Sequence, residues 1–213
     1  GMTLEGTPGI VTPAGVAGLT FVDEVERANA VVPELTAQGV EAIVMNASGC
    51  GVTVREYGHI LADDPTHAHK AARVSLLTRD LSELLPELVP VLKPKLAQQP
   101  DANKVIGFHP PCTLQHGQRI RGTVEALLAA AGYTLTPVRD AHLCCGSAGT
   151  YSVLQPELSV TLRTNKLDSL LAGGAGRIAS ANIGCIGHLQ AGTEVPVTHW
   201  IELLDKRLGP TAA

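Results

Sequence analysis

Residues 163–185 read RTNKLDSLLAGGAGRIASANIGC, and this stretch decides the expected fold. Its first part carries apolar residues at helical spacing, and the glycines that follow end the helix. RIASAN (177–182) is then typical of a strand, and it leads directly into Gly184 and Cys185. A helix that returns into a strand predicts parallel α/β layers.

The same alternation continues along the rest of the chain. Further strands are expected at EAIVMN (41–46), KVIGFH (104–109), YTLTPV (133–138) and VPVTHW (195–200). Helices are expected over residues 22–38, 52–61, 66–85, 117–132, 155–172 and 201–208. The fold class predicted from this order is α/β, with short parallel sheets flanked by helices.

An earlier stretch repeats the pattern of residues 163–185. RANAVVPELTAQGVEAIVMNASGC (27–50) has the helix, the strand and the Gly-Cys in the same order, and LTRDLSELL (77–85) mirrors VTHWIELLD (197–205). Two related modules are therefore expected, with EAIVMN and RIASAN in equivalent strands. The expected division is a first module over residues 1–85, a linker rich in proline over 86–103, and a second module over 104–213.

The composition is that of a folded protein with no nucleic-acid partner. The 213 residues are 45% hydrophobic and 17% charged, and the net charge of −4 comes without a Lys/Arg-rich run. No apolar run approaches the roughly 20 residues of a membrane span. The first residues also lack the basic and apolar regions of a secretory signal. The expected location is the cytoplasm, where cysteines stay reduced.

Each cysteine of the chain comes shortly after an expected strand. The five are Cys50, Cys112, Cys144, Cys145 and Cys185. Because the carboxyl ends of parallel strands meet at one edge of a sheet, their side chains are expected to converge there. An odd number of cysteines in a reducing compartment favours a metal site or catalysis over a disulfide framework.

Simpler interpretations stand beside a metal site. A single cysteine after a strand, such as Cys50, is often only a small buried apolar residue. Cys144 and Cys145 are also adjacent, although a disulfide between neighbours is strained. Four histidines lie within a few residues of a cysteine, where they act either as hydrogen-bond partners or as ligands: His109, His116, His142 and His188.

Cys112, then Cys144-Cys145-Gly146, then Cys185 together match the cysteine-rich CCG motif. The chain resembles the cysteine-rich subunit of heterodisulfide reductase, the lactate-utilisation proteins and, above all, the C-terminal half of the iron–sulfur subunit of bacterial glycolate oxidase. That similarity extends over residues 22–208. It is carried by HPPCTLQHGQ (109–118), HLCCGSAGTYSVLQPELS (142–159), ANIGCIGHLQAGT (181–193) and VTHWIELLD (197–205).

The resemblance implies an electron-transfer subunit rather than a complete enzyme. It implies an iron–sulfur redox module that passes electrons in a glycolate or lactate (2-hydroxy acid) oxidase-type complex. The expected ligands of one [4Fe–4S] cluster are Cys112, Cys144, Cys145 and Cys185, with Gly146, Gly149 and His188 in contact with the cofactor. The implied partners are a flavin-containing 2-hydroxy acid oxidase subunit and a ferredoxin-like domain or subunit. Through them the chain would lie at the inner face of the membrane.

The sequence departs from the family pattern in three ways. It has no ferredoxin-type C-x-x-C-x-x-C run. Near Gly9 it reads TPGIVTPAG where the first repeat should carry its own Cys-Cys-Gly, so Cys50 stands alone and the first module is expected to hold no cluster. Finally, Cys185-Ile-Gly-His188 stands where the full pattern has Cys-x-x-Cys, which leaves the fifth ligand open.

These departures keep a second interpretation open. Three or four thiolates with a histidine also suit tetrahedral zinc, so the alternative is a docking module that is stabilised by zinc or free of metal. Separation from a ferredoxin-like domain and a flavin subunit predicts an exposed apolar patch near the cysteines and some self-association. A cluster in such a site is also expected to be lost when the protein is purified in air.

Overall fold

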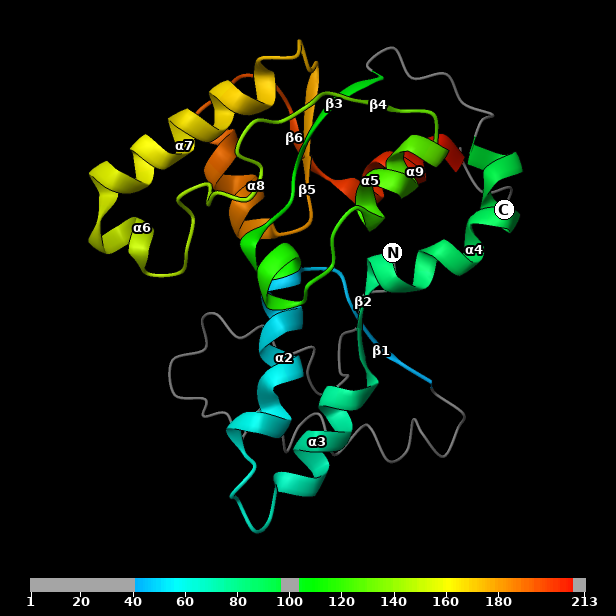
Figure 1. Cartoon of the computed structure of the whole chain (residues 1–213), viewed down its shortest axis with the longest axis vertical. Helices are drawn as coiled ribbons and strands as arrows, with labels where there is room; N and C mark the ends of the chain where they lie inside the picture. Colours follow the sequence, from blue (N-terminus) through cyan, green and yellow to red (C-terminus); the bar gives the residue numbers. More distant parts are fainter. Residues whose placement is uncertain (1–40, 97–103, 209–213) are drawn as a thin grey trace, which may run out of the picture. The chain divides into compact units, whose positions relative to one another are not determined.

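The computed structural model describes residues 41–96 and 104–208 and divides them into two compact units, whose elements are drawn in Figure 1. Unit 1 holds the described residues up to Met45 together with Gly49–Asp80, and unit 2 holds Asn46–Ser48 and the described residues from Leu81 onwards. Unit 1 has a parallel sheet of two strands and unit 2 a parallel sheet of four. The predicted α/β class, with short parallel sheets flanked by helices, is confirmed.

Unit 1 consists of two helices beside two short strands. Its elements are β1 (Ile43–Met45), α2 (Ser48–Ile60), α3 (Ala68–Leu77) and β2 (Thr78–Asp80). Its core is formed by Val54, Tyr57, Leu61, Ala71, Val74 and Leu77. Gly58 allows α2 and α3 to approach closely, because an added Cβ would lie 3.0 Å from the Ala72 Cα. The Gly58 N–H donates to Ser75 Oγ at 2.9 Å and fixes this contact.

Unit 2 is a parallel sheet with helices on both faces. The strands are β3 (Val105–His109), β4 (Thr134–Leu135), β5 (Arg177–Ser180) and β6 (Val197–His199), in the order β4-β3-β5-β6. One face is covered by α5 (Thr123–Ala130) and α9 (Trp200–Leu208), and the other by α7 (Pro156–Leu171) and α8 (Ile183–Gln190) (Figure 1). The helix α4 (Leu81–Leu96) packs against α5 and α9. Two short pieces complete the unit: a π-helical turn, η1 (Thr113–Gly117), and α6 (Tyr151–Leu154).

The alternation of side chains along β3 assigns its residues to the two faces. Ile106 and Phe108 are buried in the core formed with α5 and α9. Gly107 points the other way, where an added Cβ would lie only 2.7 Å from the Leu170 carbonyl oxygen. The missing side chain therefore lets α7 lie directly on the strand. By the same alternation His109 belongs to the α7 and α8 face.

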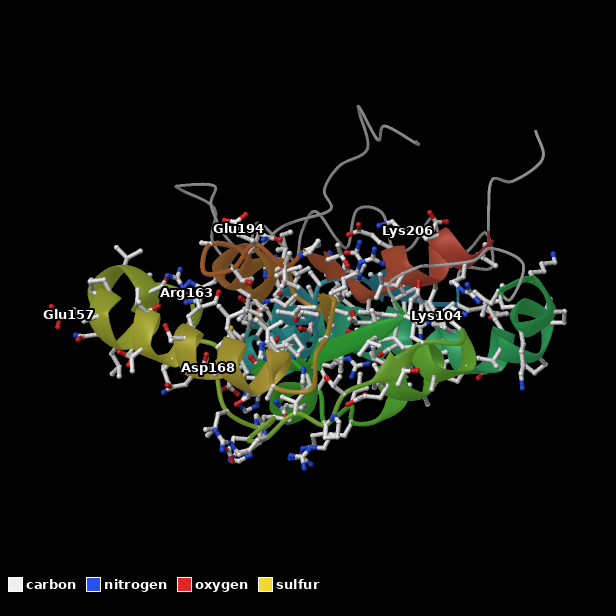
Figure 2. The ribbon with its side chains drawn as sticks, turned by 90° about the horizontal axis from the view of Figure 1, so that it is seen from above. Lys104, Glu157, Arg163, Asp168, Glu194 and Lys206 are labelled. Carbon is white, nitrogen blue, oxygen red and sulfur yellow. The ribbon has the colours of Figure 1, made fainter. Side chains whose placement is uncertain are left out.

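Helix α7 has one buried and one solvated side. Ser159, Lys166, Leu167 and Leu170 are buried, whereas Glu157 and Asp168, labelled in Figure 2, are exposed. With 16 residues, α7 matches α4 in length.

Within residues 41–96 and 104–208, no helix combines the length and the apolar character needed to cross a membrane.

The two halves of the internal repeat form equivalent strands, as expected. In unit 1, β1 pairs in parallel with β2, with Ile43 opposite Thr78. In unit 2, β5 pairs in parallel with β6, with Ile178 opposite Val197. The helix that follows begins at the third residue after the strand in both cases, α2 after β1 and α8 after β5. The helix predicted over 22–38 and the region near Gly9 lie outside the described residues.

The predicted linker over 86–103 is helical as far as Leu96, and residues 97–103 lie outside the described ones. Pro86, Pro90 and Pro94 were the reason to expect a linker, but all three are exposed residues inside α4. The helix packs against the core of unit 2 through Leu81, Leu85, Val89, Leu92 and Leu96.

Three other predicted boundaries were wrong. The helix expected over 66–85 is interrupted by β2, a strand of three residues, too short to show an alternating pattern. The helix expected over 117–132 is confined to α5, and the strand expected over 133–138 to β4. The predicted division of the chain into one module that ends at residue 85 and a related module that begins at residue 104 stays a prediction.

Gly107→Ala tests the close contact between β3 and α7. The added methyl group would meet the Leu170 carbonyl oxygen, so the free energy of unfolding of the metal-free protein should fall by about 1–3 kcal/mol. Gly187→Ala is the matched control, because an added Cβ there meets nothing within 4 Å. Denaturant titration followed by circular dichroism measures both. Equal stability of Gly107→Ala and the parent protein would contradict this contact.

Candidate metal centre

The edge of the sheet at the carboxyl ends of β3 and β5 has the geometry of a ligand site. These strands are neighbours, but the chain leaves β3 towards α5 on one face and leaves β5 towards α8 on the other. In parallel α/β sheets, ligands bind outside the strand ends at such a reversal. The two ends are joined directly, because Ser180 Oγ donates to the His109 carbonyl oxygen at 3.0 Å.

Four of the five cysteines lie around this point. Cys112 directly precedes η1, three residues beyond the end of β3, and Cys185 lies in the first turn of α8. Cys144 and Cys145 lie in the loop between β4 and α6. Cys145 and Cys185 are buried, whereas Cys112 and Cys144 are half-buried. Cys50 belongs to α2 in unit 1 and is half-buried there.

The four sulfurs are in contact one after another. Cys112 hydrogen-bonds with Cys144, Cys144 with Cys145, and Cys145 with Cys185. The hydrogen bonds that Cys112 and Cys145 make to Cys144 are the main reason that the pKa of Cys144 lies far below its usual value. The hydrogen bond between Cys145 and Cys185 is likewise the main reason that the pKa of Cys185 is lowered to about 5.

The other two thiols change in the opposite direction. Hydrogen bonding to the Cys144 thiolate, followed by burial, raises the pKa of Cys112, and hydrogen bonds to Cys144 and Cys185 raise the pKa of Cys145. Raised and lowered pKa values therefore alternate along the group. Two donors add to the stabilisation of the thiolates: the Gly146 N–H lies 3.3 Å from Cys144 Sγ, and Asn182 Nδ2 lies 3.6 Å from Cys185 Sγ.

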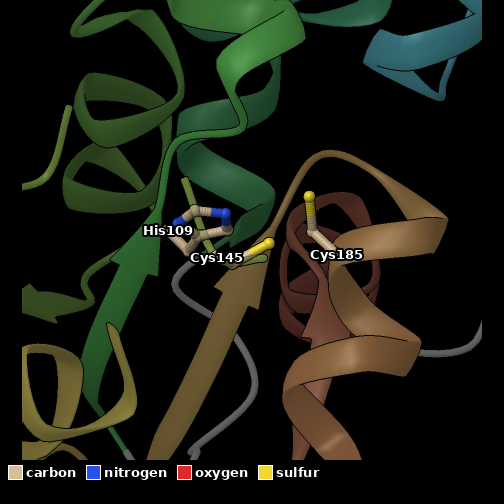
Figure 3. Close-up of side chains that lie close together, drawn as sticks. All are labelled: His109, Cys145 and Cys185. Atoms are coloured by element: carbon tan, nitrogen blue, oxygen red, sulfur yellow. The ribbon is translucent and has the colours of Figure 1, made fainter. Parts of the chain in front are cut away.

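His109 completes the group from the end of β3. Its side chain is fully buried, and one ring nitrogen and the Cys145 and Cys185 sulfurs all lie within 4.8 Å of one another. Figure 3 shows the ring turned towards these two sulfurs. The sequence placed His109 close to Cys112 but could not distinguish it from the other histidines. The usable signal was its position as the last residue of a buried strand.

The remaining predicted contacts lie around the cysteine pair. Gly146 has a φ of +94°, and an added Cβ would collide with the Ser159 carbonyl oxygen, so this position requires glycine. His188 Nε2 lies 3.3 Å from Ser159 Oγ, next to Gly146 rather than among the sulfurs that His109 approaches. Gly149 has a φ of +49° and open space around its Cα.

Cys144 also borders a cavity of about 260 Å³. Lys166 lies in its wall and donates to the Asp140 carbonyl oxygen at 2.7 Å. Burial lowers the pKa of Lys166, and the neighbouring Cys112 and Cys145 act against that shift. The walls carry both signs of charge, from Arg139 and Lys166 and from Asp140 and Asp168. The cavity gives small molecules a route to the Cys144 sulfur.

The opposite pKa shifts of Cys144 and Cys112 predict different reactivities in the reduced, metal-free protein. An ordinary thiol, with a pKa near 8.5, reacts roughly 10-fold more slowly for each pH unit below that value, because only the thiolate attacks. Cys144 is expected to react with iodoacetamide at a rate nearly independent of pH between about pH 6 and 8, whereas Cys112 should react far more slowly. Peptide mass mapping measures both rates. Faster labelling of Cys112 would contradict the proton arrangement.

Comparison with known proteins places this site in a recognised domain. Residues 106–190 match the model of the cysteine-rich domain named CCG. This range contains all four clustered cysteines, His109 and His188.

The similarity extends beyond that domain. The chain is 49% identical to the glycolate oxidase iron–sulfur subunit of Escherichia coli over 172 residues, which are 80% of this chain and 40% of that protein. It is 30% identical to the probable glycolate oxidase iron–sulfur subunit of Bacillus subtilis, over 86% of this chain and 43% of that one. Lactate utilization protein A of Bacillus cereus is 28% identical over 81% of this chain and 73% of its own length.

The chain thus spans less than half the length of the two glycolate oxidase relatives. The resemblance inferred from the cysteine motif is confirmed: residues 106–190 match the cysteine-rich CCG domain, and the chain is similar to glycolate oxidase iron–sulfur subunits over most of its length.

Proposed function

We propose that this chain is the cluster-binding part of an iron–sulfur subunit in a 2-hydroxy acid oxidase-type complex. The observation that carries the proposal is the contiguous group of four sulfurs from Cys112, Cys144, Cys145 and Cys185. Thiolates are the usual ligands of iron–sulfur clusters. The names of the homologous subunits in Escherichia coli and Bacillus subtilis support the same cofactor.

The four thiols suit such a cofactor by their element and also by the negative charge that they can take on when they lose their protons. Hydrogen bonding and burial raise the pKa of Cys112 and of Cys145, and these two thiols would release their protons on binding iron. The Gly146 N–H and Asn182 side chain already donate to sulfur, and hydrogen bonds of this kind tune the potential of a cluster. The cofactor supplies one-electron transfer, which the side chains of this site cannot supply alone.

We propose a [4Fe–4S] cluster rather than a single metal ion. Adjacent residues Cys144 and Cys145 cannot easily turn both sulfurs towards one tetrahedral ion, whereas a cluster offers a separate iron atom to each. Gly146 allows the chain to turn directly after the pair. In this proposal Gly149 leaves room for the cofactor, and His188 supports the loop through Ser159.

The proposed partners are a flavin-containing subunit that oxidises a 2-hydroxy acid and a ferredoxin-like domain or subunit. The chain itself would carry electrons between them on the cytoplasmic side of the membrane, and it would not hold the substrate. Large apolar side chains are exposed close to the cysteines in the sequence and in α6, which supports a docking surface. They are Leu143, Val153, Leu154 and Ile183, with 48%, 77%, 70% and 70% of their surface exposed.

A zinc ion is the second candidate for the bound metal. With zinc, the proposed function would be that of a docking module without redox activity. The observation that favours it is the compact trio of His109, Cys145 and Cys185, whose ligand atoms lie within 4.8 Å of one another. Zinc would leave Cys112 and Cys144 without a role. Iron, sulfide and zinc analysis of protein prepared without oxygen separates the two candidates.

Serine substitution tests the proposed ligands one at a time. After anaerobic reconstitution with iron and sulfide, the variants Cys112→Ser, Cys144→Ser, Cys145→Ser and Cys185→Ser should each lose most of the iron and the visible absorption. Cys50→Ser is the matched control and should retain both, because it lies in unit 1 outside the group of four. Full iron content in Cys144→Ser, or iron loss in Cys50→Ser, would contradict the assignment.

Self-association tests the proposed docking surface. Without its partners the protein should form dimers or larger species that increase with concentration, because large apolar side chains face the solvent. Light scattering measures this, and a double variant with Val153→Glu and Leu154→Glu should shift the equilibrium towards the monomer. A parent protein that stays monomeric at high concentration would contradict the surface.

A further inference from the structure

The His109 side chain is fully buried, with an exposed fraction of 0%. Its ring hydrogen-bonds with the Cys185 thiol, and neither ring nitrogen has an oxygen or nitrogen partner among the residues that the structure describes. Buried polar groups are almost always paired, because leaving water without a replacement bond is unfavourable. A buried imidazole whose only polar neighbour of this kind is a thiol therefore points to a group that binds there in the working protein.

We propose that His109 is a nitrogen ligand of the metal centre, beside the four cysteines. A ring nitrogen and the sulfurs of Cys145 and Cys185 come within 4.8 Å of one another, which is the spacing at which donors can share a metal site. This inference rests on the proposed iron–sulfur function and adds a ligand to it. A cofactor with several metal and sulfur atoms can also accept a hydrogen bond from the second ring nitrogen.

The neighbouring histidines are already engaged elsewhere. His188, which follows Cys185 in the motif, lies with Nε2 at 3.3 Å from Ser159 Oγ and 3.4 Å from the Ser159 carbonyl oxygen. The exposed His116 donates to the His142 carbonyl oxygen at 3.1 Å and receives a hydrogen bond from Arg121. Among the three rings of His109, His116 and His188, the ring of His109 is the one that faces the sulfurs.

The backbone holds His109 in position for this role. It is the last residue of β3 and pairs in register with Ser180 at the end of β5, and its carbonyl oxygen accepts the hydroxyl proton of Ser180. The ring cannot turn to solvent, because the residue is fully buried and the strand alternation directs it to the α7 and α8 face. A ligand held by a central strand is better fixed than one in a loop.

An imidazole ligand is neutral where a thiolate is negative, so it favours the reduced state of a cluster. Histidine in place of cysteine raises the potential of iron–sulfur centres for this reason. The variant His109→Cys should therefore lower the midpoint potential while keeping a donor atom at the position. The control variant His116→Ala, at an exposed histidine, should leave the potential close to that of the parent protein.

Pulsed electron paramagnetic resonance of the reduced, iron-loaded protein tests the ligand directly. Protein labelled with ¹⁵N-histidine should show the large hyperfine coupling of a metal-bound nitrogen. That coupling should disappear in His109→Cys and persist in His188→Ala. Labelling in the parent protein needs no substitution, so the test does not depend on whether a variant at this buried position folds.

The possible results of these experiments distinguish a failure of the His109 ligand from a failure of the proposed iron–sulfur function. An iron-loaded parent protein without a strongly coupled histidine nitrogen would overturn the ligand and leave the cluster in place. Loss of the coupling in His188→Ala, or its survival in His109→Cys, would also overturn the role of His109. A protein that binds no iron in any preparation would overturn the proposed function and this ligand together.

Discussion

The organisation of unit 2 depends on the alternation of side chains along β3. Ile106 and Phe108 anchor the strand in the core with α5 and α9, which turns Gly107 and His109 towards the other face. Gly107 then lets α7 lie against the strand, since no side chain separates it from the Leu170 carbonyl oxygen. Two residues later in the same register, His109 arrives beside the cysteines at the sheet edge. A shift of one residue would exchange the two faces and remove this ring from the site.

The cysteine group is stabilised by sharing protons among its members. Four neighbouring thiolates would repel one another strongly in a partly buried site, and four neutral thiols would leave few strong hydrogen bonds. The alternating raised and lowered pKa values of these cysteines favour a state between the two extremes. The Lys166 ammonium contributes a compensating positive charge. A site in this state can accept metal cations by releasing protons, without moving its strands or helices.

The sequence was sufficient to predict the parts of the fold that follow simple periodicity. The strands around Ile106 and Ile178 and the helix α7 were found because buried strands and amphipathic helices leave clear patterns. The equivalence of β1 and β5 followed from the repeat.

The predictions that failed depended on contacts between distant residues. The helix α4 contains Pro86, Pro90 and Pro94, and only their shared exposed side makes them compatible with it. The strand β2 is too short to identify before its pairing with β1 is known. The roles of His109 and His188 could not be separated in the sequence, because both lie three residues from a cysteine. Their surroundings separate them, since His188 contacts Ser159 and His109 faces the sulfurs.

In the proposed holoprotein the sheet edge at β3 and β5 brings four cysteine sulfurs to one iron–sulfur cluster. The most direct measurement is anomalous X-ray scattering at the iron edge, on crystals grown without oxygen from reconstituted protein. We expect iron density beside the sulfurs of Cys112, Cys144, Cys145 and Cys185, at metal–ligand distances of roughly 2.3 Å. Zinc density confined to His109, Cys145 and Cys185, or iron bound away from these four sulfurs, would contradict it.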